Sequence, residues 1–232
     1  TATKRLGAGT ATHDGLINNP GGLAAVWAEQ NDRNAIFAGI RRAETYATSG
    51  PRIALRFFGG WGYAGGLCSA DDKLTTAYAG GVPMGGSLGS AESAAPTFLL
   101  STEHDPGTAA APGSELQRMQ IVKGWLKDGA AHEKVFDVAG DATVGVDVDT
   151  ATCEPSSEGA ASLCTVWTDP EFDAGQHAFY YARVLETVSC RWSARECLKL
   201  SGADRPAMCD DPALAKVVQQ RAWSSPIWYT PT

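Results

Sequence analysis

The chain changes its hydrophobic period at Gly50-Pro51, and this change constrains the fold more than any other feature of the sequence. Apolar side chains between residues 36 and 43 recur at helical spacing, which predicts a helix over residues 31–46 with Asn31 as its N-cap. Apolar side chains between residues 53 and 57 alternate with other residues, as the two faces of a strand require. Because proline cannot continue a helix, we expect the chain to pass from helix to strand at this turn.

Strand patterns separated by turns dominate the rest of the chain. Apolar or alternating segments predict further strands at residues 97–102, 116–125, 133–138, 163–168 and 179–186. The tail is weakly helical over residues 211–221, and aromatic residues 223–229 predict a last strand. We therefore expect an α+β, mainly β fold with a β-sandwich-like domain.

The pattern divides the chain into two unequal regions. Residues 1–50 form a loop-and-helix segment that is too short to own a hydrophobic core. Residues 51–232 form the β-sandwich-like domain, with its short helical tail and final strand. The chain starts at Thr1 rather than at methionine and shows no signal peptide, so we expect either a removed leader or a longer parent protein.

Charge and hydrophobicity exclude two classes of partner. The net charge is −7 and the Lys and Arg residues do not cluster, so we expect no nucleic-acid partner. No apolar run approaches the roughly 20 residues that a membrane-spanning helix needs. Hydrophobic residues still make up 44% of the chain, which is enough to bury a sizeable core.

The cysteines predict disulfides rather than a metal site. The number is even and no C-x-x-C pair occurs, which argues against zinc ribbons and thioredoxin-like motifs. Cys153 and Cys164 flank a Ser/Gly-rich loop, as a local disulfide does, while residues 190–209 hold a second cluster. We expect two or three disulfides and an oxidising compartment; the alternative is a cytosolic protein with buried thiols. The six candidates are Cys68, Cys153, Cys164, Cys190, Cys197 and Cys209.

Histidines and tryptophans offer weaker candidates for a site. No two of the four histidines form a chelating pair, so we expect surface positions for His104, His132 and His177; His13 is a weak candidate metal ligand. Tryptophans can present flat faces to a sugar or aromatic ligand, although their strand positions favour core packing. The six that carry this alternative are Trp61, Trp125, Trp167, Trp192, Trp223 and Trp228.

An ordered set of motifs resembles a known family over residues 15–232. It includes Thr-Ser-Gly-Pro-Arg-Ile at 48–53, Arg-Phe-Phe-Gly-Gly-Trp at 56–61, Gln-Ile-Val-Lys-Gly-Trp at 120–125 and Ser-Pro-Ile-Trp-Tyr at 225–229. Together these motifs resemble a group of bacterial proteins, often secreted and of unassigned function, in the PHP (polymerase and histidinol phosphatase) superfamily of metal-dependent hydrolases. The resemblance implies that residues 1–50 are the C-terminal edge of a PHP-type α/β barrel.

The same resemblance implies an activity that this chain does not complete. The family carries His-x-His and Ser-Asp-Thr-His metal motifs, and neither has a counterpart here. We therefore expect the complete protein to use a divalent metal (zinc, manganese or iron) on an ester or phosphoester bond, with its metal ligands upstream of this chain. The chain alone is predicted to hold no metal and to be inactive. Its expected partners are the upstream barrel and an unknown small-molecule substrate, in a secreted or periplasmic protein.

Residues near the junction of the two regions are the candidates for substrate binding. An arginine or the Thr-Ser-Gly backbone can hold an anionic oxygen of a substrate, although the arginines can equally solvate a helix face. The candidates are Glu29, Arg41, Arg42, Tyr46, Thr48, Ser49 and Arg52. The alternative function is a self-sufficient β-sandwich binding module that recognises a saccharide or a protein partner.

Overall fold

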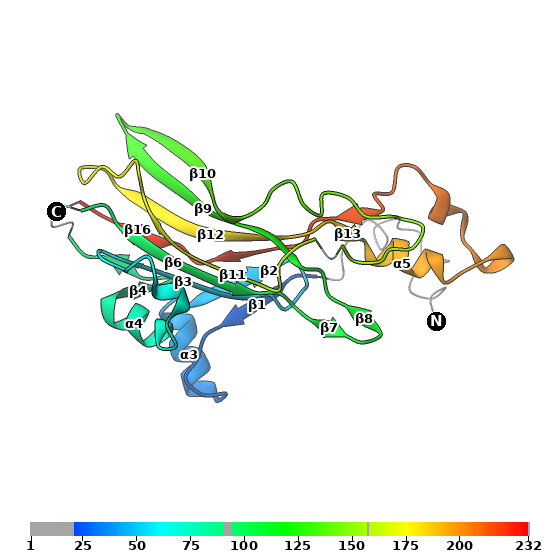
Figure 1. The fold of residues 1–232 in the computed structure, drawn as a ribbon, viewed down its shortest axis with the longest axis horizontal. Helices are drawn as coiled ribbons and strands as arrows, with labels where there is room; N and C mark the ends of the chain where they lie inside the picture. Colours follow the sequence, from blue (N-terminus) through cyan, green and yellow to red (C-terminus); the bar gives the residue numbers. More distant parts are fainter. Residues whose placement is uncertain (1–20, 91–93, 157, 232) are drawn as a thin grey trace.

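Two mainly antiparallel sheets packed face to face form the body of the protein (Figure 1). The computed structural model describes residues 21–90, 94–156 and 158–231. The smaller sheet has the order β11-β6-β3-β4, with strands Ser162–Thr168, Thr97–Glu103, Ala54–Gly60 and Gly81–Pro83. The mainly β fold predicted from the sequence is therefore confirmed, whereas no barrel precedes it in the described residues.

The larger sheet is built around its long central strand β12. On one side β12 pairs with β9, and β9 pairs with β10; on the other side it pairs with β15 and β16. Strands β2 and β1 extend the sheet beyond β15, and the short β5 pairs in parallel with β16. The strands are β1 Leu23–Val26, β2 Thr45–Thr48, β5 Ser87–Leu88, β9 Leu116–Lys127, β10 Ala130–Gly140, β12 Ala178–Glu186, β15 Arg221–Ser224 and β16 Ile227–Tyr229.

A tight turn joins β9 to β10. Lys127 pairs with Ala130, so that only Asp128 and Gly129 connect the strands. Both have positive φ, 51° and 77°, and such a turn matches the right-handed twist of the flanking strands. The Asp-Gly pair therefore fixes the register of the longest hairpin.

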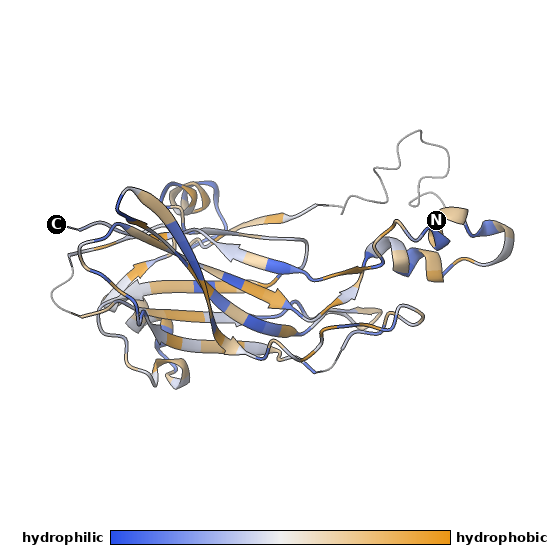
Figure 2. Cartoon of the chain, turned by 90° about the horizontal axis from the view of Figure 1, so that it is seen from above, coloured by the Kyte–Doolittle hydropathy of each residue, from blue (hydrophilic) through white to orange (hydrophobic). Residues whose placement is uncertain are grey.

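The hydrophobic core fills the space between the two sheets. Phe57 and Phe98 from the smaller sheet stack with ring centroids 5.5 Å apart, and both are fully buried. Tyr180 and Ile121 meet them from the larger sheet and are also fully buried. The hydropathy colouring in Figure 2 shows how apolar and polar residues are distributed along these strands.

A second, smaller core covers the outer face of the smaller sheet. Helix α4 (Lys73–Gly80) and the 3₁₀ turn η1 (Leu67–Ser69) pack against Phe58 and Leu99. The Tyr63 hydroxyl donates a hydrogen bond to the carbonyl of Ala77 at 2.6 Å, and burial raises the pKa of Tyr63 to about 12. This layer attaches the helix to the sandwich.

A small lobe extends from one end of the sandwich (Figure 1). It contains β13 (Ser189–Cys190), β14 (Val217–Val218), α5 (Trp192–Leu198), η2 (Gly202–Asp204) and η3 (Ala207–Asp210). The hairpin of β7 (Gly107–Thr108) and β8 (Ala111–Pro112) is a separate two-stranded sheet. The elements of the lobe are too short to bury a large hydrophobic core, so covalent links stabilise it.

All six cysteines form disulfides, and the pairing corrects one prediction. Cys153 pairs with Cys190 rather than with Cys164, and Cys164 pairs with Cys68 from η1. The third bridge joins Cys197 to Cys209 inside the lobe. Cys164 lies on β11, which packs against η1, so the sheet brings residues 68 and 164 together. Three disulfides indicate a compartment outside the reducing cytosol. Among the described residues, no helix is long and apolar enough to cross a membrane.

The helix predicted over residues 31–46 is shorter than expected. Helix α3 spans Arg33–Arg41, and its N-cap is Asp32 rather than Asn31, since the Asp32 Oδ1 accepts a hydrogen bond from the Ala35 amide at 2.8 Å. Ala43 then adopts a left-handed φ of 53°, which ends the helix. The chain reverses and enters β2.

The predicted helical tail was wrong. Residues 217–218 and 221–224 are strands β14 and β15, and the last strand β16 is separate from β15. The sequence predicted only a loop and a helix in residues 1–50, yet Leu23–Val26 pairs with β2 as β1. Helix α4 was not predicted. The division of the chain at residue 50 stays a prediction, although both strands before it belong to the larger sheet.

Candidate functional site

A polar pocket opens beside helix α3 at the edge of the sandwich. Its walls come from the loop after β1, the turn before β2, strand β3 and helix α4. The volume is about 600 Å³, which lies within the usual range of small-molecule sites. We call it the Glu44 pocket, and its lining residues are Trp27, Ala28, Glu29, Arg42, Glu44, Arg56, Tyr78 and Pro83.

The buried carboxylate of Glu44 organises the pocket. Glu44 is only 3% exposed and accepts a short hydrogen bond from the hydroxyl of Tyr78. Its Oε2 lies 3.3 Å from Nη2 of Arg42, and its Oε1 lies 3.7 Å from Nη1 of Arg56. A buried charge needs such partners to offset the loss of hydration. Glu44 therefore fixes the positions of both guanidinium groups.

Trp27 supports the guanidinium of Arg56. The Trp27 Nε1 donates a hydrogen bond to the carbonyl of Leu55 at 2.8 Å, which holds the indole ring in place. The guanidinium carbon of Arg56 lies 3.4 Å from the ring centroid, as in a cation–π contact. Tyr46 stacks against the same indole with ring centroids 6.0 Å apart, and burial raises the pKa of Tyr46.

The pocket is suited to binding a polar group rather than a highly charged one. A guanidinium carries five N–H donors, so the contacts to Glu44 use only part of the capacity of Arg42 and Arg56. The two arginines and Glu44 sum to one positive charge, and Glu29 in the lining brings the sum to zero. Burial, followed by the nearby Glu44 carboxylate, raises the pKa of Tyr78, so its hydroxyl keeps its proton at neutral pH.

The structure brings together some of the predicted substrate-binding residues. Glu29 and Arg42 line the Glu44 pocket, and Tyr46 packs against the indole of Trp27. Arg41 is exposed at the last turn of α3, outside the lining.

Three other predicted residues lie at the far end of β2. Thr48 is buried, and its Oγ1 accepts a hydrogen bond from the Gly50 amide at 3.2 Å. The Ser49 hydroxyl donates to the side chain of Gln220 at 2.6 Å, and the amide of Arg52 donates to the Asp105 carboxylate at 2.8 Å. Because residues 45–48 are a strand that rises about 3.3 Å per residue, β2 separates this group from the Glu44 pocket.

Sequence reasoning missed most of the pocket. Trp27, Glu44, Arg56 and Tyr78 were not among the predicted site residues. Arg56 is the polar position in the alternating segment at residues 53–57, which is the one signal that marked it. The other contacts join segments that are distant in sequence.

The described residues do not fit a catalytic divalent metal. In residues 21–90, 94–156 and 158–231, no three His, Cys, Asp or Glu side chains come together in a group that can hold a metal ion. Nδ1 of His104 lies 3.3 Å from the carbonyl of Ser114, and His132 stacks on Trp125. His13 lies outside the described residues, so its role as a ligand stays a prediction. We therefore derive no hydrolytic step from this chain.

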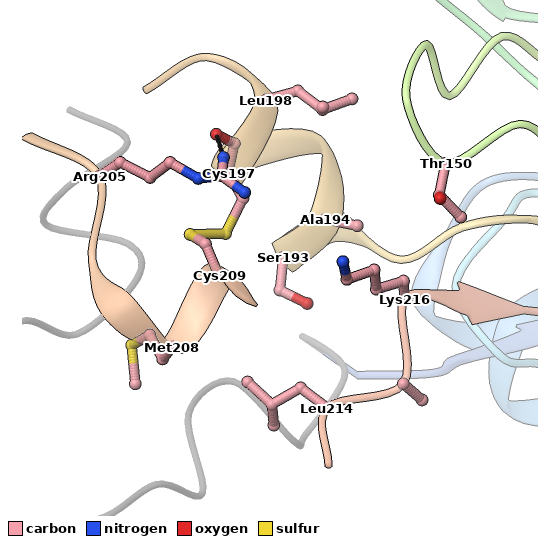
Figure 3. Close-up of a pocket in the computed structure, with 11 residues that line it drawn as sticks. Thr150, Ser193, Ala194, Cys197, Leu198, Arg205, Met208, Cys209, Leu214 and Lys216 are labelled. Atoms are coloured by element: carbon pink, nitrogen blue, oxygen red, sulfur yellow. Dashed lines mark hydrogen bonds between the residues drawn. A yellow bond between two sulfur atoms is a disulfide. The ribbon is translucent and has the colours of Figure 1, made fainter. Parts of the chain in front are cut away.

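The disulfide-linked lobe contains a crevice, whose lining residues are drawn in Figure 3. It lies beside the Cys197–Cys209 bridge, and its volume is about 40 Å³, far below the size of a ligand site. Arg205, one of its lining residues, donates to the carbonyl of Cys197 and forms an ion pair with Asp210 at 2.9 Å. These contacts stabilise the lobe and leave the Glu44 pocket as the better candidate.

Comparison with known proteins gives one match. The sequence model of the family described as "Protein of unknown function (DUF3604)" matches residues 1–231. No curated protein and no solved structure matches the chain.

Proposed function

We propose, from the premise that this chain belongs to the DUF3604 family, that it is the β-sandwich part of a metal-dependent hydrolase of ester or phosphoester bonds. In this proposal a barrel upstream in the same polypeptide holds the zinc, manganese or iron ion, and the chain alone is inactive. The upstream motifs and the metal come from the family resemblance of the sequence.

One observation supports the proposal: the Glu44 pocket opens next to an exposed apolar face of α3. Phe37 and Ile40 on this helix are 60% and 53% exposed. Gly39 packs against the end of β1, because a Cβ there would lie 2.7 Å from Cγ2 of Val26. An exposed apolar pair beside a pocket with fixed polar groups fits a surface that more protein covers. The covering part then completes a site that this chain leaves open.

Within such a site, the residues of this chain bind and orient the substrate. The N–H groups of Arg42 and Arg56 can donate to an oxygen of the ester or phosphoester group. Glu44 holds both guanidinium groups before the substrate arrives, which lowers the entropic cost of binding. A singly charged phosphodiester or a neutral ester fits the charge balance of the pocket better than a phosphate monoester does.

The proposal predicts a binding defect when Arg56 is replaced by lysine. Lysine keeps the charge but loses the planar guanidinium that lies over Trp27 and contacts Tyr78. In the complete natural polypeptide supplied with zinc, manganese or iron, we expect Arg56→Lys to raise KM for bis(p-nitrophenyl) phosphate or p-nitrophenyl acetate roughly tenfold, with a smaller effect on kcat.

Arg118→Lys is the matched control for this experiment. The side chains of Arg118 and Arg56 are both 22% exposed and ion-paired, but Arg118 pairs with Asp137 on the larger sheet. We expect its kinetic constants to stay unchanged. A complete polypeptide that cleaves neither substrate with any of the three metals overturns the hydrolase, and an unaffected Arg56→Lys variant overturns the role of the pocket.

The apolar face of α3 predicts self-association of the isolated chain. Changing Phe37 and Ile40 together to serine removes two exposed apolar side chains, so we expect the dimer dissociation constant to rise at least about tenfold in sedimentation equilibrium. The control is Val146→Ser, since Val146 is 56% exposed but lies in a loop distant in sequence from α3. Equal association of both variants contradicts the proposed interface.

The alternative function, a binding module, is favoured by a different observation. Several of the tryptophans pack on the core, as Trp61, Trp125 and Trp167 do, which agrees with the core-packing interpretation. Trp228 does not pack on the core, because it is 49% exposed, and this exposed ring is the observation that favours a binding module.

A further inference from the structure

A groove lined by aromatic residues crosses the outer face of the larger sheet. Tyr180 and Ile227 are fully buried in the core, so their neighbours Phe179 and Trp228 point to the opposite, outer face. Phe179 and Trp228 are cross-strand partners, with ring centroids 5.5 Å apart. We call this the Trp228 groove.

Gly124 shapes the floor of the groove. It is the partner of Phe179 on β9, and a Cβ at this position would lie 2.3 Å from the Phe179 ring. The missing side chain therefore lets the ring lie across the strand. Tyr181 continues the line of rings two residues farther along β12, with its ring plane within 13° of that of Phe179. The sheet thus presents a strip of aromatic faces rather than a single ring.

The groove has the size of a ligand site and carries little charge. Its volume is about 630 Å³, within the usual range of small-molecule sites. Glu133 is the only acidic residue in the lining, and the lining contains no Lys or Arg. His177 and Thr230, which share the outer face with Phe179 and Trp228, add hydrogen-bonding groups. An anionic ligand therefore finds no cation here, which argues against nucleic acids and anionic lipids.

We propose that the Trp228 groove binds a neutral oligosaccharide. A pyranose ring has weakly polarised C–H groups on its faces, which are attracted to the electron-rich face of an aromatic ring, and hydroxyl groups around its edge. The groove offers the same combination: the aromatic faces of Phe179 and Trp228, and a carboxylate, an imidazole and a hydroxyl among its lining residues. Because the groove is open to solvent, it suits a ligand that keeps one side hydrated. This inference does not depend on the proposed hydrolase function.

The test is titration calorimetry of the oxidised 232-residue chain with three neutral hexasaccharides, namely cellohexaose, xylohexaose and mannohexaose. We expect at least one of them to bind, and Trp228→Ala to weaken that binding roughly tenfold or more, as truncation of a central tryptophan does. Trp228 is half exposed, so we expect the melting temperature of the variant to stay close to that of the wild type. Phe37→Ala is the matched control, because Phe37 is an exposed aromatic residue on α3, outside the groove lining. We expect it to bind the sugar as the wild type does.

Three results overturn the proposal. One is the absence of binding to all three hexasaccharides. Another is binding that Trp228→Ala leaves unchanged, which places the sugar elsewhere. The third is tighter binding of an anionic chain such as polygalacturonate than of every neutral sugar, which contradicts the charge argument. Glu133→Gln gives a second measurement, since it removes the one carboxylate in the lining while the aromatic strip stays intact; we expect it to weaken binding less than Trp228→Ala does.

Discussion

Replacing Asp169 by asparagine is expected to lower the free energy of unfolding by about 3–5 kcal/mol, the cost of leaving one partner of a buried ion pair uncompensated. Asp169 is 1% exposed, and its Oδ2 lies 2.6 Å from Nζ of Lys123. The same oxygen accepts a hydrogen bond from the hydroxyl of Tyr180 at 2.7 Å. Lys123 points into the core from β9, and a neutral amide at residue 169 leaves its charge without a counterion. Urea unfolding of the oxidised chain at pH 7 measures the effect.

Two further variants separate the ion pair from ordinary damage to the core. Lys134 and the side chain of Glu171 also form an ion pair, but both are nearly half exposed, so Lys134→Ala is expected to cost less than about 1 kcal/mol. Changing Lys123 to methionine together with Asp169 to leucine removes both charges, and we expect this double variant to be more stable than Asp169→Asn. An Asp169→Asn variant that loses no more stability than Lys134→Ala would falsify the prediction.

The free energy of unfolding is expected to fall as pH rises from about 4.5 to 8, because of Glu186. This side chain is 2% exposed, and its Oε1 has no hydrogen-bond partner among the described residues. Burial, with a smaller contribution from Asp105, raises the pKa of Glu186 to about 8. The unfolded chain releases this proton near pH 4.5, so in that window the native state binds more protons and each rise in pH favours unfolding. The upper bound of the loss is about 5 kcal/mol above pH 8.

Glu186→Gln isolates this contribution from those of the other carboxyl groups. Glutamine has nearly the same shape and does not ionise, so we expect the variant to gain stability over the wild type as pH rises and to match it near pH 5. Chemical denaturation at pH 5, 6.5 and 8 measures the difference. Glu103→Gln, at an exposed end of β6, is expected to follow the wild type at every pH. A constant difference between Glu186→Gln and wild type across this range contradicts the assignment.

The long strands could be predicted from the sequence because their alternation is local. Predicted strands at residues 97–102, 116–125, 163–168 and 179–186 correspond to β6, β9, β11 and β12 with small changes at the ends. One face of each strand must be apolar to pack on the other sheet, and this requirement is visible in any window of a few residues. The helix start near residue 32 was visible for the same reason, because its cap and its apolar stripe are both local.

The short elements could not be predicted, because they depend on distant partners. β14 is a strand only because residues 189–190 lie beside it, and β1 exists through its pairing with β2. Their own residues carry no strong periodic pattern, so the weak helical preference of the tail was a poor guide. The left-handed conformation of residue 43 likewise could not be predicted, because the residue is an alanine rather than a glycine.

The Glu44 pocket could likewise be predicted only in part from the sequence. Arg42 and Glu29 were predicted from their position near the junction, and they do line the pocket. Tyr78, which donates a hydrogen bond to Glu44 in the same pocket, comes from α4, 34 residues beyond Glu44, and only the packing of α4 near the edge of the sheet brings the two together. The sequence also could not show that Thr48 and Ser49 lie away from the Glu44 pocket, because their separation from it depends on the strand geometry of β2.

The sequence by itself determined the fold class, the central strands, the presence of disulfides and membership of the DUF3604 family, since each depends on residue types and spacing along the chain. Only the tertiary structure decided which cysteines pair, which carboxylates are buried, and which aromatic rings face solvent. These properties depend on the register of strands that lie up to 180 residues apart, as the contact between Thr45 and Ser225 illustrates. A shift of one residue in such a pairing moves each side chain to the opposite face of the sheet, so no local pattern can fix it.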